Sequence, residues 1–170
     1  CRMFHALRGP AIWMSRFEGR RIVRDTPIDR PIYVTGMARA GTTVSLEMLS
    51  RHPETATHRY FHMVNPYWAH WWNRIIHLLP LPEEELVERI HKDGLMVNRD
   101  SPDAMEEPSW KHFFGHLHDE GQSNILDANT SNPAFERYYR AHMAKLVASQ
   151  GASRYLAKNN YSVTRMEYLL

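Results

Sequence analysis

The sequence has little cysteine and no long apolar run. Its one cysteine, Cys1, cannot form an internal disulfide, which favours a reducing compartment, and we expect a cytoplasmic protein. The stretch from Ile75 to Leu81 is interrupted by His77 and Pro80 and is far shorter than the roughly 20 residues of a membrane-spanning helix, so no transmembrane segment is predicted. Runs of like charge are also missing. Lys and Arg number 21 against 19 Asp and Glu, so nucleic acid is not an expected partner and any anion site should be local.

Hydrophobic spacing and helix-breaking residues predict a helix-rich chain. One predicted helix has a break at Gly9-Pro10 and is followed by a polar connector to Pro31. Another carries Trp68, Trp71 and Trp72 on one face, which we expect to pack in the core rather than to form an acceptor wall. The helices are predicted over residues 2–18, 42–51, 65–80, 82–91, 101–114 and 132–150.

Two short β-branched or apolar segments, 32–35 and 154–157, are each followed by a polar loop and a helical pattern. Residues 94–100 are predicted to form a loop or short strand. The alternation of strand, loop and helix predicts an α/β fold, with a P-loop-like parallel sheet flanked by helices. The chain starts at Cys1 without a methionine and stops at Leu170 within a helical pattern, so we expect a single domain that is truncated.

Residues 36–43, Gly-Met-Ala-Arg-Ala-Gly-Thr-Thr, have the G-x-x-x-x-G spacing of a phosphate-binding loop and lie between a predicted strand and helix. Backbone N–H groups of such a loop, with the N-terminus of the next helix, surround an anion. Nucleotide hydrolases have lysine after the second glycine, where this chain has Thr42, and Arg39 becomes the obvious cation. The loop therefore predicts an anion site without the usual lysine and metal pair.

The segment 31–53, P-I-Y-V-T-G-M-A-R-A-G-T-T-V-S-L-E-M-L-S-R-H-P, resembles the 5'-phosphosulfate loop and following helix of the sulfotransferase family. The usual form is P-R-S-G-T-T or P-K-S-G-T-T, from which Ala38 and Ala40 depart. The resemblance is closest to bacterial members of the group that includes tyrosylprotein sulfotransferases. It implies transfer of a sulfuryl group from 3'-phosphoadenosine-5'-phosphosulfate (PAPS) to an acceptor hydroxyl. The implied donor-binding residues of the loop are Gly36, Arg39, Ala40, Gly41, Thr42 and Thr43.

Two further segments resemble the same family. Residues 154–170 are similar to its strand-lysine-helix segment, which implies that Lys158 contacts the sulfate or the leaving phosphate of the donor. Residues 100–107 resemble, less specifically, acceptor-side segments of bacterial members. The family's 3'-phosphate clamp follows the lysine segment and is expected beyond Leu170.

The general base departs from the patterns of the family. Cytosolic small-molecule sulfotransferases place a catalytic histidine two residues after the lysine, where this chain has Asn160, which cannot act as a base. The tyrosylprotein branch uses a glutamate soon after the first loop helix. The corresponding stretch, 57–62, offers histidine, the chemically able substitute. We expect His62 to be the base, acting with Arg39 and Lys158, and the alternatives are His58, Glu106 and Glu107.

Other interpretations stay open. His112, His116 and His118 are poor candidates for metal ligands because the third lies off the helical face of the first two, and no metal is predicted. The acceptor hydroxyl belongs to a small molecule, a carbohydrate, a lipid or a peptide, and the oligomeric state is unknown. A divergent P-loop kinase and a non-catalytic P-loop scaffold, which binds a partner through the tryptophan helix, are the alternative functions.

Overall fold

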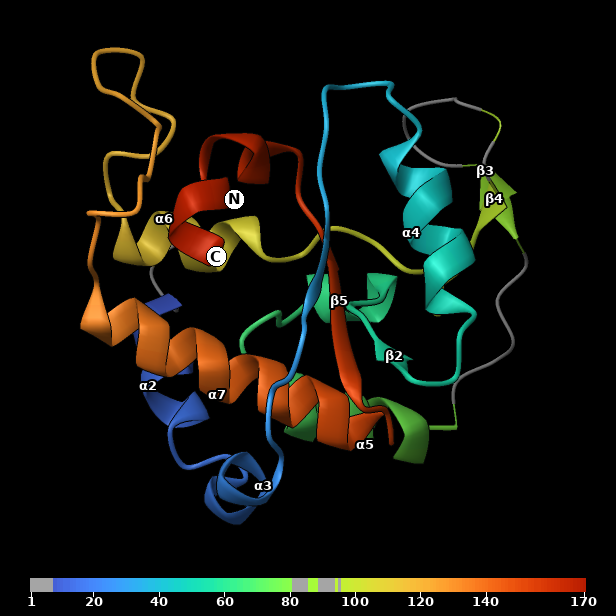
Figure 1. Ribbon diagram of the computed structural model, residues 1–170. Helices are drawn as coiled ribbons and strands as arrows, with labels where there is room; N and C mark the ends of the chain where they lie inside the picture. The colour runs from blue at the N-terminus through green and yellow to red at the C-terminus, as the bar shows by residue number, and fades with distance from the viewer. Residues whose placement is uncertain (1–7, 81–85, 89–93, 95) are drawn as a thin grey trace.

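The centre of the molecule is a three-stranded parallel sheet flanked by helices (Figure 1). The computed structural model describes residues 8–80, 86–88, 94 and 96–170. Its strands run in the order β1-β5-β2, so that β5, late in the chain, lies between two early strands. Both pairings are parallel, and Val34 of β1 is the partner of Lys158 of β5. The predicted α/β class and parallel sheet are confirmed.

Helices and short strands alternate along the described residues. In chain order they are α2 (Arg8–Ser15), α3 (Arg20–Asp25), β1 (Ile32–Val34), α4 (Thr42–Ser50), β2 (Thr55–Ala56), the 3-10 helix η1 (Tyr60–Met63), α5 (Ala69–Leu78), β3 (Val87–Glu88), β4 (Met96–Val97), α6 (Glu107–Phe113), α7 (Pro133–Ser149), β5 (Arg154–Lys158), the 3-10 helix η2 (Asn160–Thr164) and α8 (Met166–Leu169). None of the helices in this part of the chain has the length and apolar character that a bilayer crossing requires.

The long helix α7 is set by local signals that the sequence displays. The side chain of Asn132 accepts a hydrogen bond from the backbone N–H of Phe135 at 3.1 Å, and Pro133 occupies the first turn, where its missing N–H costs nothing. Gly151, with φ 64°, follows the last turn in the left-handed conformation. The predicted helix 132–150 is confirmed at both ends.

The main core lies where α6 and α7 meet β5. Trp110 of α6 is fully buried, and its ring centroid lies 4.3 Å from that of Phe135 and 5.6 Å from that of Tyr139 on α7. Tyr155 and Leu156 of β5 have no exposed surface. Burial of these large side chains, each worth about 1.5–3 kcal/mol, fixes β5 as the central strand.

The N-terminal region differs from its prediction. The single helix expected over residues 2–18 is represented by α2, and residues 2–7 lie outside the described part. Gly9-Pro10 does not break the chain, since both residues lie in the first described turn of α2. The chain instead turns at Gly19, with φ 59°, and a second helix, α3, occupies part of the expected polar connector.

The middle of the chain also departs from its prediction. The helix expected from residue 65 begins only at Ala69, because the side chain of Asn65 accepts from the backbone of Tyr67 in a turn. Residues 87–88 of the expected acidic helix form β3, which pairs antiparallel with β4, and the range 81–85 and 89–93 is not described. The β4 strand agrees with the expected loop or short strand at 94–100.

The helix expected from residue 101 begins six positions later, at Glu107. Residues 101–103 pair with residues 58–60 and therefore do not join the helix. The backbone N–H of Asp103 donates to the carbonyl of His58 at 3.0 Å, and a β-bridge joins Arg59 to Pro102. The tryptophan face of α5 is half-buried. Its indole N–H groups donate inward, that of Trp68 to the carbonyl of Ala11 at 3.0 Å.

Candidate functional site

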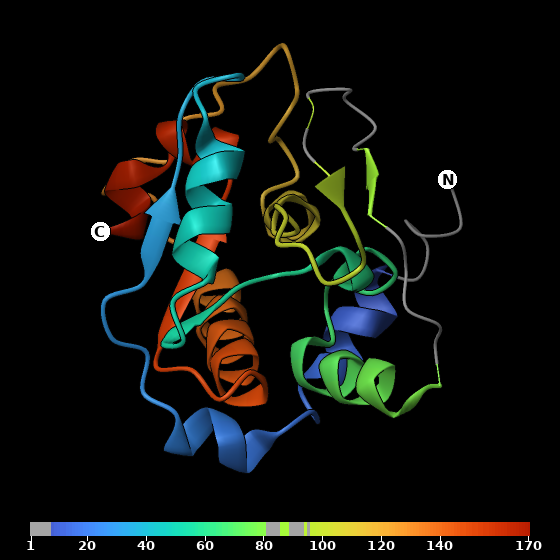
Figure 2. The ribbon, with the colours of Figure 1, turned by 90° about the vertical axis from the view of Figure 1, so that its right-hand side faces the viewer.

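The loop 36–43 joins the carboxyl end of β1 to the first turn of α4 and stands at one edge of the sheet (Figure 1, Figure 2). Gly41 adopts φ 77° and ψ 10° and caps α4. A Cβ on Gly36 would lie 3.2 Å from Cγ2 of Thr42, so the loop closes tightly on the helix start. Arg39 has φ 66°, a conformation that a residue with a side chain rarely adopts. The loop is therefore compact and locally strained.

The outer side of this loop is exposed. The side chain of Arg39 is exposed and has no ion-pair partner among the described residues, and residues 37–41 all face solvent. Thr42 is buried, and its hydroxyl donates to Oδ1 of Asn160 at 3.3 Å. The first amides of α4 have no intrahelical acceptor and carry the positive end of the helix dipole. A guanidinium and a helix N-terminus thus belong to one short loop, which suits an anion.

The parallel pairing of β1 with β5 brings Lys158 to the same edge. The backbone N–H of Asn159 donates to the carbonyl of Val34 at 3.1 Å, and the hydroxyl of Thr35 donates to the carbonyl of Asn160 at 3.4 Å. The structure therefore places the loop segment and the lysine segment, far apart in sequence, side by side.

Glu107, the first residue of α6, is at the centre of a polar cluster beside the lysine segment. Its two oxygens accept from both terminal nitrogens of Arg165 at 2.9 Å, and Oε2 accepts from Nδ2 of Asn159 at 2.7 Å. Nε2 of His118 lies 2.5 Å from Oε1. Burial alone would raise the pKa of Glu107, but the bonds from Arg165, Asn159 and His118 outweigh it and hold that pKa below its ordinary value. Glu107 is an ionised, multiply bonded carboxylate.

Glu106 is buried in the core. Its Oε1 accepts from the hydroxyls of Tyr139, at 2.5 Å, and Tyr155, which join α6 to α7 and β5. Burial raises the pKa of Glu106 and favours its neutral form. Through these hydrogen bonds Glu106 connects α6 to α7 and β5.

The structure places His62 and His58 inside the molecule. His62, on η1, has no exposed surface, and its Nδ1 accepts from the backbone N–H of Arg59 at 3.0 Å. Burial, with the nearby His58, lowers the pKa of His62 to about 2. Nε2 of His58 lies 2.9 Å from Nε2 of His142, and burial lowers the pKa of His58 to about 4. Neutral, enclosed imidazoles of this kind suit core packing better than proton transfer with a substrate.

Sequence reasoning missed three members of the polar cluster at Glu107, namely His118, Asn159 and Arg165. Asn159 and Arg165 lie in the segment that resembles the strand-lysine-helix unit. They are 52 and 58 positions from Glu107, and no local pattern in the sequence indicates that they pair with it. Within the described residues, no group of three or more His, Cys, Asp or Glu side chains is arranged to hold a metal ion.

No match to this chain was found among protein-family models, curated proteins or solved structures.

Proposed function

We propose that this chain is the donor-binding part of a sulfotransferase, which transfers the sulfuryl group of PAPS to an acceptor hydroxyl. The observation that carries the proposal is the pairing of β1 with β5, with Val34 beside Lys158. The two segments that resemble the sulfotransferase family are thereby adjacent, as donor binding by both would require. A cytoplasmic location is part of the proposal, and the acceptor class stays open among small molecules, carbohydrates, lipids and peptides.

On this proposal the loop 36–43 is P-loop-like and surrounds the 5'-phosphosulfate. Gly41 in the left-handed conformation and the N-terminus of α4 direct amides to the anion. Arg39 supplies the counter-charge that lysine and magnesium supply in nucleotide hydrolases. Lys158 approaches the same group from the end of β5.

Positioning and electrostatic stabilisation dominate such a transfer. The acceptor oxygen attacks sulfur in line, and the bond from sulfur to the bridging phosphate oxygen breaks. Negative charge then builds on the bridging oxygen, where Arg39, Lys158 and the loop amides stabilise it. The acceptor loses its proton to a base as the bisphosphate leaves.

Thermal denaturation of the full-length protein, including the expected 3'-phosphate clamp, with adenosine 3',5'-bisphosphate tests the proposal. We expect the bisphosphate, and not Mg-ATP, to raise the melting temperature, since a ligand at 100 times its Kd stabilises by about 2.7 kcal/mol. Stabilisation by Mg-ATP instead would favour a divergent P-loop kinase, and by neither ligand a non-catalytic scaffold.

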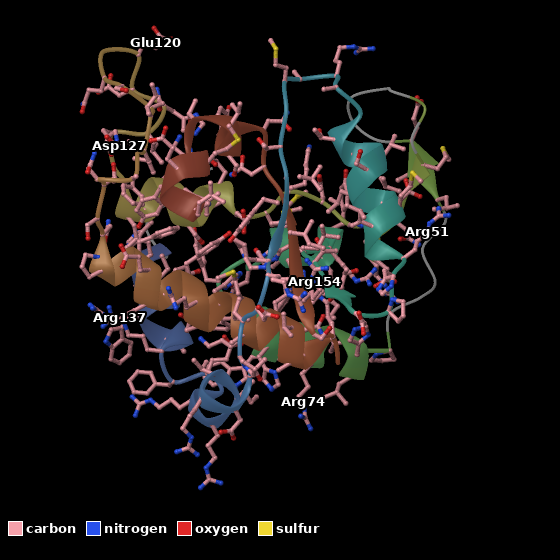
Figure 3. All side chains as sticks on the ribbon, in the orientation of Figure 1. Arg51, Arg74, Glu120, Asp127, Arg137 and Arg154 are labelled. Atoms are coloured by element: carbon pink, nitrogen blue, oxygen red, sulfur yellow. The ribbon has the colours of Figure 1, made fainter. Side chains whose placement is uncertain are left out.

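Variants sharpen this test. Arg39→Ala and Lys158→Ala should each weaken bisphosphate binding about tenfold or more, because a hydrogen bond to a charged group contributes about 1.5–3 kcal/mol. Arg51→Ala is the matched control: this arginine lies at the end of α4 remote from the loop (Figure 3) and pairs with Glu47 at 2.8 Å on the surface. Equal losses in all three variants would count against a specific anion site.

A further inference from the structure

His118 is held in a backbone conformation that costs free energy. Its φ is 71°, and among the described residues only Arg30, Arg39 and His118 combine a side chain with a positive φ. Arg39 belongs to the candidate anion loop. Strained residues of this kind persist where surrounding contacts hold them, and they are frequent at functional sites. Here the backbone N–H of His118 donates to Oδ1 of Asn124 at 2.6 Å, which fixes the strained turn.

The imidazole of His118 is oriented by a carboxylate. Nε2 lies 2.5 Å from Oε1 of Glu107, whose charge is in turn fixed by two bonds from Arg165. Because an ionised carboxylate only accepts hydrogen bonds, Nε2 carries the proton directed at Glu107, and Nδ1 is the ring nitrogen left for another partner. No hydrogen-bond partner of Nδ1 occurs in the described part of the chain. The side chain is 24% exposed.

The ring of Tyr161 supports this arrangement from η2. Its centroid lies 4.2 Å from that of His118, at an angle of 71° between the ring planes. With Glu107 on one nitrogen and Tyr161 against the ring, rotation of the imidazole is restricted. A base held in this way by a second and a third group is the arrangement that proton transfer requires.

A continuous chain of contacts connects this histidine to the anion loop. Oε2 of Glu107 accepts from Asn159, the residue after Lys158, and Oδ1 of the following Asn160 accepts from Thr42 at the start of α4. In Figure 1 the segment after α6 and the loop after β1 both rise above the same edge of the sheet, with η2 and α8 between them. The contacts of Glu107 and Asn160 thus link His118 to the segment that borders the loop.

We propose that His118 is the general base of the sulfuryl transfer, with Glu107 as the positioning residue that orients it. The inference rests on the proposed function. Nδ1 of His118 takes the proton of the acceptor hydroxyl while the acceptor oxygen forms its bond to sulfur. The bond between sulfur and the 5'-phosphate oxygen breaks, and its electron pair leaves with the bisphosphate. The imidazolium, stabilised by Glu107, then releases its proton to solvent.

This assignment separates His118 from the histidines expected at first. His62 and His58 are enclosed in the core, whereas the side chain of His118 is 24% exposed and belongs to the polar cluster beside the lysine segment. The charged and titratable groups that face His118 are Glu107 from α6, Arg165 from the turn before α8 through its bonds to Glu107, and Tyr161 from η2.

The variant His118→Gly offers a clean test, because glycine adopts a φ of 71° without strain and the backbone need not move. The full chain is assayed for sulfuryl transfer from PAPS to 4-nitrophenol and to water, the latter as release of inorganic sulfate, which requires no knowledge of the natural acceptor. We expect H118G to lower the rate about 100-fold or more, the scale of general-base catalysis. Added imidazole should restore part of it. Stabilisation by adenosine 3',5'-bisphosphate should be unchanged.

The pH profile is a second readout. A general base must be free of its proton to act, so the rate of the wild-type protein should fall on the acid side, and H118G should lose that acid limb until imidazole is added. His116→Ala, in the same segment, is the matched control and should keep the wild-type rate within about twofold, because His116 lies outside the cluster around Glu107.

Each outcome bears on one of the two claims. Three outcomes overturn the role of His118. The H118G variant keeps the rate within about threefold, it loses the rate without rescue by imidazole, or it loses bisphosphate stabilisation together with the rate. The same role is overturned by a wild-type protein that binds the bisphosphate but transfers to neither acceptor, although donor binding then stands. A wild-type protein that neither binds the bisphosphate nor transfers removes the proposed function itself.

Discussion

Glu106 and Glu107 are consecutive residues at the start of α6, yet their environments are opposite. Glu106 extends into the core, where it meets the hydroxyls of Tyr139 and Tyr155 and burial raises its pKa. Glu107 extends to the edge of the sheet. Burial opposes its ionisation there, but the bonds led by those from Arg165 lower its pKa. One residue joins elements of the core and the other organises a polar edge, so the surroundings decide the role of each carboxyl group.

The largest expected effect comes from removing the charge at the edge. Glu107→Ala leaves Arg165, which is 1% exposed, without its counter-charge and should lower the free energy of unfolding by about 3 kcal/mol. Urea denaturation measures it. Glu47→Ala, which breaks the exposed pair with Arg51, is the control and should cost under about 1 kcal/mol. Similar costs in both variants would show that the edge cluster is no stronger than a surface pair.

The contrast between core and edge also predicts a pH effect at His58. Its pKa in the folded protein is about 4, below the ordinary value of 6.5, so the unfolded chain binds a proton first. The stability that comes from this difference is present above pH 6.5 and is lost as the pH falls from there towards 4, by up to about 3 kcal/mol. His58→Gln should flatten the dependence of the urea midpoint on pH in this range. An unchanged slope would contradict the buried, neutral state.

A smaller effect is expected at Glu106, with the opposite sign. Because its pKa is raised in the folded protein, its contribution to stability is fully present below 4.5 and is lost as the pH rises towards the folded value. Glu106→Gln keeps an acceptor for the two tyrosines and has no charge to bury. Relative to the wild-type protein, the variant should be more stable at pH 8 than at pH 5, as urea midpoints at the two pH values measure. A gain at pH 5 instead would reverse the assignment of the neutral carboxyl group.

The smallest effect is expected in the loop itself. Gly41→Ala places a side chain at φ 77° and should cost about 1 kcal/mol through backbone strain alone, since open space surrounds the added Cβ. Gly115→Ala, which also adds a Cβ in open space but outside the positive-φ region, should be nearly neutral. Equal stability of the two variants in urea would show that the loop is not strained.

The elements with strong local signals were predictable from the sequence. The β-branched run before Gly36 and the capped helix that begins at Pro133 needed no distant contact to be recognised. The two-residue strand β2 was missed because it exists only through its pairing with β5, and α6 begins late because residues 101–103 pair with residues 58–60. Where long-range pairing competed with local preference, the pairing prevailed.

The candidate site divides in the same way. The loop 36–43 is one contiguous stretch with the glycine spacing of a phosphate-binding loop, so the sequence alone located it and the lysine segment. The structure brings the two segments together. The enclosure of His62 could not be predicted, because the packing of His58, Phe61 and distant α7 around it leaves no local pattern. The cluster at Glu107 depends on partners 11 to 58 positions away and becomes evident only in three dimensions.

The central position of β5 has a consequence for biosynthesis. Thr42 and Asn160 are 118 positions apart. A nascent chain therefore contains the loop early, but the segment that packs beside it, β5 with η2, leaves the ribosome only later. Pairings of such separation form slowly, and until then the apolar face of α4 and the edge of β1 are open to wrong partners. Completion of the sheet by β5 is thus the step after which the surroundings of the loop are in place.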